Sequence, residues 1–293
     1  MSLSKLSQSG TVQSEQYEAL HVEEISKNES EEDYKYRTWV AARAILGEFL
    51  ATLVFLFVAE MSIINLSQHS KAPGLAQALA QGFIGIAVIY SFADVSGAHF
   101  NPAVTFACWI AGKTSNRRAI LYVLAQLLGS IVASALVNAV AAPGMLDLLL
   151  VHKGPGIAVW QAILMEVLLT FVLVFVIFTT AFDLIPAKSQ YSKLTTVVKN
   201  LILYNVSPQS KAGFAPLAIG FTIMALACTG GAISGGAFNP ARVFGVACIS
   251  GDFTDNWIYW VGDFTGAFVA VCIRQSYWYL FKHIADSSPI LPQ

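Results

Sequence analysis

Apolar residues form long uninterrupted runs along the chain, with little alternation between apolar and polar positions. A hydrocarbon core about 30 Å thick needs roughly 20 apolar residues in a helix to cross it. Two apolar runs, 101–111 and 239–250, are too short for that. Six runs are long enough and predict membrane-spanning helices: 39–63, 75–95, 117–141, 158–182, 213–233 and 256–281. The pattern predicts an all-α membrane protein with six transmembrane helices and two half-length helices.

The composition favours the same class of protein. Of the 293 residues, 56% are hydrophobic and 12% are charged, and the mean hydropathy is +0.61. Soluble domains carry about 25% charged residues, so this chain has too few polar groups to cover its surface in water. A net charge of −1 offers no basic face to nucleic acid. Because the sequence has no HExxH, GxSxG or CxxC motif, we expect no enzymatic activity, no metal ion and no cofactor.

Lysine and arginine residues in short loops predict the orientation of a membrane protein. They gather after the first short run, at Lys113, Arg117 and Arg118, and in the long loop 183–212, which places both segments in the cytoplasm. Six spans then put both termini in the cytoplasm. We expect an acidic, serine-rich, disordered tail over 1–37 and a short C-terminus over 283–293. The plasma membrane and a vesicle membrane are alternative locations.

The two halves of the chain repeat each other. GEFLATLVFLF at 47–57 matches MEVLLTFVLVF at 165–175, and SGAHFNPA at 96–103 matches SGGAFNPA at 234–241. We assign repeat one to 38–141 and repeat two to 158–282. Because each repeat has an odd number of spans, the second must be inverted in the membrane. Inverted repeats with half-length helices are typical of transport pathways.

The two Asn-Pro-Ala (NPA) segments predict how the half-helices begin. Asparagine is a favoured N-cap and proline suits the first helical position. Inverted symmetry would bring the two helix N-termini together near the middle of the membrane. Their partial positive charge and free N–H groups would accept a neutral solute and repel cations. The residues of the two segments are Asn101, Pro102, Ala103, Asn239, Pro240 and Ala241.

The glycine-rich stretches before each NPA are expected to be non-helical and to line the pore with carbonyl groups. Their pore-lining residues are Gly97, Ala98, His99, Gly235 and Ala237, with a buried core histidine as the alternative for His99. Glu48 and Glu166 occupy matching places in the repeats and are interpreted as buried supports of these loops, with solute contact as the alternative. Asp263 in the last span has no evident partner.

These motifs resemble those of the aquaporin (major intrinsic protein) family over 38–282, a channel domain. The shared features are the paired SGxxxNPA segments, the arginine after the second NPA, the repeated E-x-x-x-T, and Gln126-x-x-Gly129. The resemblance implies six spans with two re-entrant half-helices, passive flow and a homotetramer with one pore per subunit. It also implies a selectivity filter at four positions: Gln81, Ala227, Gly236 and Arg242.

The filter differs from that of strict water channels in the family, which have Phe and His at the positions of Gln81 and Ala227. Ala227 would widen the constriction and Gln81 would make it more polar. Val243 after the arginine, and Tyr259-Trp260 in the last span, resemble the water branch rather than the glycerol branch. The alternatives to pore lining are a lipid or helix contact for Gln81 and a headgroup anchor for Arg242. The family's Trp-Val-Gly-Pro motif in the last span corresponds to residues 260–263 here, where Asp263 replaces the proline.

The loop 183–212 is long enough to need a function. One hypothesis is a lid in which Ser192, Val197, Leu201 and Tyr204 form the candidate gate, with a kinase acting on the loop or on the tail. The alternative is a helix on the membrane surface, held to anionic lipid by its lysines.

The sequence therefore predicts a passive channel in a lipid bilayer for water and small neutral solutes such as glycerol, urea, ammonia and hydrogen peroxide. One alternative is a solute facilitator with little water flow. Another is a secondary transporter, for which Glu48 and Glu166 would be the only intramembrane carboxylates around a cavity.

Overall fold

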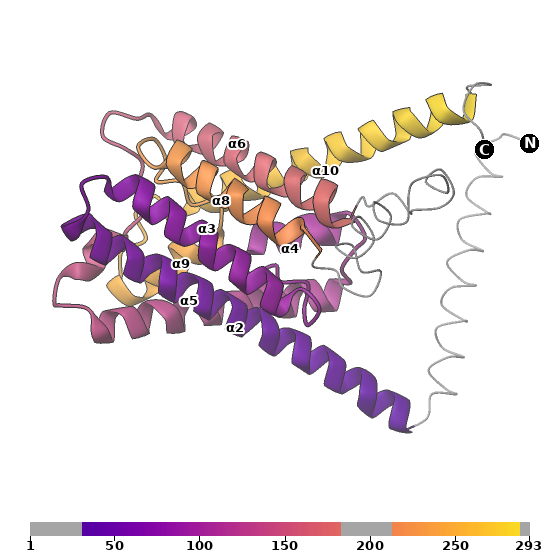
Figure 1. Ribbon diagram of the computed structural model, residues 1–293, viewed down its shortest axis with the longest axis horizontal. Coiled ribbons are helices and arrows are strands. Elements are labelled where there is room, and N and C mark those ends of the chain that lie inside the picture. The colour runs from indigo at the N-terminus through magenta and orange to yellow at the C-terminus, as the bar shows by residue number, and fades with distance from the viewer. Residues whose placement is uncertain (1–30, 183–212, 288–293) are drawn as a thin grey trace, which may run out of the picture. The chain divides into compact units, whose positions relative to one another are not determined.

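The computed structural model describes residues 31–182 and 213–287, which are helical with connecting turns and contain no strand (Figure 1). This confirms the all-α prediction. The elements are α2 (Glu31–His69), α3 (Pro73–Phe92), α4 (Pro102–Ile110), α5 (Asn116–Val140), the 3₁₀ turn η1 (Met145–Leu149), α6 (Val159–Ile177), the π-helical turn η2 (Phe178–Phe182), α8 (Ala215–Gly230), α9 (Pro240–Ser250) and α10 (Asn256–Ser287).

Five helical segments of the described residues are long and apolar enough to cross a membrane: 31–69, 74–92, 116–140, 159–182 and 256–277. The sixth predicted span, 213–233, is shorter than expected, because α8 has 16 residues and rises about 24 Å. The helix ends early since Ile233 and Ser234 both donate their backbone N–H to the Gly230 carbonyl in a turn. That turn leads directly into the second NPA segment.

The disorder predicted for residues 31–37 is wrong, because α2 already begins at Glu31. Acidic side chains in the first turn stabilise the positive end of the helix, and Lys35 lies 2.6 Å from Glu31 in an i,i+4 pair. Residues up to Arg43 form a unit separate from the one that starts at Ala44. The rest of the predicted tail, 1–30, lies outside the described residues.

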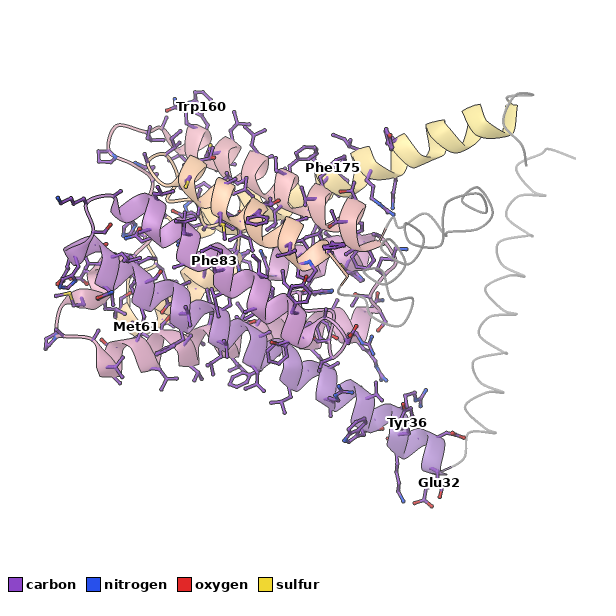
Figure 2. All side chains as sticks on the ribbon, in the orientation of Figure 1. Glu32, Tyr36, Met61, Phe83, Trp160 and Phe175 are labelled. Carbon is purple, nitrogen blue, oxygen red and sulfur yellow. The ribbon has the colours of Figure 1, made fainter. Side chains whose placement is uncertain are left out.

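Within the second unit, two pairs of helices pack across the two repeats, α3 with α8 and α5 with α9, while α6 packs with α10 inside the second repeat. Glycine allows the closest approach between α3 and α8. A Cβ atom on Gly82 would lie 2.6 Å from the Gly220 carbonyl oxygen, and one on Gly220 would lie 2.8 Å from that of Gly82. Large apolar side chains such as Phe83 and Trp160 point away from the core and are exposed, as expected where lipid replaces water (Figure 2).

Candidate functional site

Both half-helices begin as their sequences predict. Asn101 and Asn239 have extended backbones, and each side-chain oxygen accepts from the N–H two residues later, at 2.9 Å from Ala103 and 3.1 Å from Ala241. Proline follows at the first helical position, where no N–H is needed. The helices α4 and α9 have 9 and 11 residues, so each rises about 15 Å, half of a hydrocarbon core.

The two helix N-termini meet. The side-chain nitrogen of Asn101 donates to the Phe238 carbonyl at 2.7 Å, and that of Asn239 donates to the Phe100 carbonyl at 3.1 Å. Each amide thus bonds the backbone just before the other half-helix. A primary amide has two N–H groups, so each asparagine keeps a second donor beyond this cross-link. The predicted concentration of donors at the meeting point is present.

Buried carboxylates hold the two loops that precede the half-helices. Glu48 accepts from the backbone N–H groups of His99 at 3.0 Å and Phe100 at 2.8 Å. Glu166 accepts from those of Ala237 at 3.0 Å and Phe238 at 2.7 Å. Both glutamates are fully buried. These bonds offset backbone strain, since Ala98, Phe100 and Phe238 have positive φ angles of 50°, 35° and 36°. The geometry supports the interpretation of both glutamates as buried supports.

Two tyrosines repeat a second contact that sequence reasoning did not identify. Tyr122 on α5 donates to the Ser96 carbonyl and Tyr259 on α10 donates to the Ser234 carbonyl, each at 2.7 Å. The signal was available, since both tyrosines stand in a pattern shared by the third and sixth predicted spans. Each of the two loops is therefore hydrogen-bonded both to a buried glutamate and to a tyrosine.

A cavity of about 140 Å³ lies beside the crossed N-termini. That volume has room for several water molecules. Its lining includes polar side chains from both repeats, Gln81 and Arg242, and the polar residues Lys113, Thr114 and Arg118. Asn101 and Asn239 also line it, together with apolar side chains that include Ile177, Ile219 and Ile223.

Most residues predicted to line the pore touch this cavity: Gly97, Ala98, His99, Asn101, Ala237, Asn239, Gln81 and Arg242. Gln81 is buried, which does not fit a lipid contact. Arg242 donates to the Gly236 carbonyl, which does not fit a headgroup anchor. His99 lines the cavity, and its Nδ1 atom lies 3.1 Å from the Thr105 hydroxyl oxygen.

Three predicted positions are absent from the cavity lining that the structure describes: Ala227, Gly235 and Gly236. Ala227 is half-buried and packs against the main apolar cluster, while Ile223, one turn earlier on α8, reaches the cavity. The candidate gate residues Ser192, Val197, Leu201 and Tyr204 lie outside the described residues. Their role stays a prediction.

Two further carboxylates, Glu60 and Asp263, are buried inside the helical bundle, and neither lines the cavity. Glu60 on α2 is 2% exposed and accepts from the Ser134 hydroxyl at 2.9 Å. Asp263 on α10 is fully buried and accepts from the Thr170 hydroxyl at 3.1 Å, so it does have a partner. Glu60 was missed because nothing in the repeat pattern marks its position.

Polar contacts connect the loop that leads into α6 with the loop that leads into α10. Nε2 of His152 lies 3.7 Å from the Asp252 carboxylate, and Asp255 accepts from the Lys153 backbone N–H at 3.4 Å. The backbone N–H and hydroxyl of Thr254 donate to Asp252 and lower the pKa of that carboxyl below its usual value. This loop therefore carries a negative charge at neutral pH.

Comparison with known proteins agrees with the geometry. The model of the major intrinsic protein family matches residues 35–274. Aquaporin-B of Dictyostelium discoideum is 45% identical over 82% of this chain and 84% of its own, and aquaporin TIP1-2 of Musa acuminata is 35% identical over 79% and 84%. The crystal structure of an aquaglyceroporin from Plasmodium falciparum shares the fold, with a TM-score of 0.66 at 22% identity, covering 85% of this chain and all of that one. The chain therefore belongs to the major intrinsic protein family, the family of the aquaporins.

Proposed function

We propose that this chain is a passive channel for water that also admits small neutral solutes, with residues 38–282 as the channel domain. The observation that carries the proposal is the pair of crossed asparagine caps beside the cavity. Two helix N-termini and two amides supply donors to a molecule with a lone pair, while their positive ends repel a cation. Membership of the aquaporin family supports the same function.

The bonding of Glu48 and Glu166 favours a passive channel over an ion-coupled transporter that would use these two carboxylates. A coupling site needs carboxylate oxygens that can receive the transported ion. In this structure both oxygens of Glu48 and both oxygens of Glu166 already accept backbone N–H groups. The two glutamates are therefore occupied in shaping the loops.

The arrangement in the membrane follows from charge and exposure. The basic loops support an orientation with both termini in the cytoplasm, in the plasma membrane or a vesicle membrane. Exposed apolar side chains on α3, α5 and α6, among them Phe83, Leu128 and Trp160, face lipid and neighbouring subunits of a homotetramer. The family resemblance is the support for four subunits.

The loop 183–212 is proposed as a phosphorylation-dependent lid. Phe182, just before the loop, and Ala215, shortly after it, both line the cavity, which supports a role of the loop at the cavity. The segment is long enough to reach across the cavity mouth, and added phosphate charge would move it. A kinase acting on the loop or on residues 1–37 is the expected partner.

Deleting residues 190–207 is expected to raise water permeability in proteoliposomes measured by stopped-flow light scattering. If the closed state is favoured by about 1.4 kcal/mol, only about a tenth of the channels are open, and deletion raises the flow about tenfold. Removing residues 1–30 is the control, which should leave the flow unchanged. Equal flow from full-length and deleted chains would contradict the lid. Absence of flow from either, at confirmed incorporation, would contradict the channel.

Introducing histidine at Ala227 is expected to narrow the filter. Glycerol permeability should fall about tenfold relative to water permeability, the effect of about 1.4 kcal/mol on the barrier. Ala225 on the same helix is exposed, and Ala225→His is the matched control. An unchanged ratio in Ala227→His together with a lowered ratio in Ile223→Phe would show that Ile223, which lines the cavity, holds this filter position instead.

A further inference from the structure

The third and sixth spanning helices carry one motif with one difference. On α5 the motif is Tyr122-x-x-x-Gln126-x-x-Gly129, and on α10 it is Tyr259-x-x-x-Asp263-x-x-Gly266. Both tyrosines donate to the equivalent loop carbonyl. Both glycines allow a close helix crossing. A Cβ atom added to Gly129 would lie 2.6 Å from the Phe49 carbonyl oxygen, and one added to Gly266 would lie 2.4 Å from the Val167 carbonyl oxygen. Asp263 therefore occupies the position of Gln126 in the other repeat.

In the first repeat the middle residue is a donor to the supporting glutamate. Nε2 of Gln126 lies 2.8 Å from Oε2 of Glu48 and 2.8 Å from the hydroxyl of Thr105. Together with the Ser96 hydroxyl and the backbone N–H groups of His99 and Phe100, this amide completes the bonding of the glutamate. The threonine of the E-x-x-x-T motif, Thr52, bonds back to its own helix at the Glu48 carbonyl.

In the second repeat the middle residue is an acid beside the supporting glutamate, Glu166: a Cβ atom on the neighbouring Gly262 would lie 2.6 Å from the Cβ atom of Glu166. Both carboxyl groups are fully buried. The matching threonine, Thr170, turns its hydroxyl to Oδ1 of Asp263 at 3.1 Å. The other oxygen, Oδ2, is buried without a donor among the described residues.

Two ionised carboxylates have only acceptor oxygens, so a hydrogen bond between them requires that one carry a proton. Each oxygen of Glu166 already accepts a backbone N–H group, from Ala237 and from Phe238, so neither oxygen needs a proton of its own to be paired. Asp263 receives one neutral hydroxyl and has a free oxygen able to hold the proton. Ionising both groups would place two like charges in contact in a buried site, which is costly.

We propose that Asp263 is a positioning residue of the second NPA loop: it is protonated and donates through Oδ2 to Glu166, as the Gln126 amide donates to Glu48. The charged and titratable groups around the pair are Glu166 on α6, Arg242 on α9 and Tyr259 on α10. With Asp263 protonated, the pair of Asp263 and Glu166 has a single negative charge, which lies near the Arg242 cation. The expected effect on water permeability rests on the proposed channel function, whereas the protonation of Asp263 does not depend on that function.

Infrared difference spectroscopy on the purified full-length protein tests the proton directly. Wild type minus Asp263→Asn should show the carbonyl band of a protonated carboxylic acid, and the band should shift in deuterated water. Glu60→Gln, which alters another buried acid, is the control and should leave that band in place. A wild-type spectrum without the band, or a band lost in Glu60→Gln and kept in Asp263→Asn, would overturn the proposal.

Water permeability then tests the positioning role. Asp263→Asn supplies an amide donor like that of Gln126 and should conduct at the wild-type level. Asp263→Leu has a similar size and no donor, and we expect its permeability to fall about tenfold at equal incorporation. Equal permeability in the Asn and Leu variants would overturn the positioning role. Failure of the channel proposal is distinguishable, because the wild type itself would then carry no flow while the infrared band remained.

Discussion

Replacing Glu48 with leucine is expected to remove nearly all water permeability. The carboxylate accepts four hydrogen bonds, from the Ser96 hydroxyl, the backbone N–H groups of His99 and Phe100, and the Gln126 amide. Leaving a buried donor unpaired costs about 1–3 kcal/mol, so four of them approach the whole stability of a typical folded protein, about 5–15 kcal/mol. The first NPA loop would lose its support. Stopped-flow measurements at equal incorporation, with thermal unfolding in detergent, provide the check.

Glu60 offers a matched control for this substitution. It lies on the same helix, is almost as buried, and accepts one hydrogen bond where Glu48 accepts four. Glu60→Leu should therefore lower the unfolding midpoint less than Glu48→Leu does. Equal losses in the two variants would show that burial of a carboxylate, rather than its bonds to the loop, accounts for the effect.

A second large effect is expected from Gly266→Leu. A Cβ atom there would lie 2.4 Å from the Val167 carbonyl oxygen and 3.0 Å from the Phe171 backbone nitrogen. These are backbone atoms of α6 that cannot move aside, so α10 must shift away from α6. Overpacking of this kind costs about 1–3 kcal/mol or more. The shift would also separate Asp263 and Tyr259 from the second loop, and we expect both a lowered unfolding midpoint and a loss of water flow.

Gly74→Leu is the matched control on α3, because a Cβ atom at that position meets nothing within 4 Å. Its unfolding midpoint and water permeability should stay close to those of the wild type. Gly129→Leu should behave like Gly266→Leu, since the Phe49 carbonyl oxygen is 2.6 Å from its added Cβ. A stable, conducting Gly266→Leu variant would show that the two helices do not need this close crossing.

The half-helices illustrate what could be predicted. Asparagine and proline act on the backbone within two residues of themselves, so the starts of α4 and α9 at Pro102 and Pro240 follow from local chemistry. The repeat also located Glu48 and Glu166, because equivalent positions in a duplicated chain have equivalent tasks. The helical start at Glu31 was missed, since a stretch rich in charged residues was read as disordered although its charges suit a helix N-terminus.

Partners that come from different helices could not be predicted. Asp263 had no evident partner because the distance from α10 to Glu166 depends on the Gly266 crossing, which no local pattern specifies. The place of Ile223 at the cavity, where Ala227 was expected, depends on the rotation of α8 against α3. A turn of a helix by one residue changes which side chain faces a cavity while leaving the hydrophobic pattern unchanged.

The sequence by itself determined the spanning helices, the inverted repeat, the two capped half-helices and the family, because these depend on hydrophobic length and on contacts between residues close in the chain. Only the tertiary structure decided which carbonyl each asparagine amide bonds, that Glu60 is buried against Ser134, and that an acid takes the place of an amide beside Glu166. The reason is physical. A buried hydrogen bond forms only when donor and acceptor lie within about 3 Å, and helix packing sets that distance between residues far apart in the sequence.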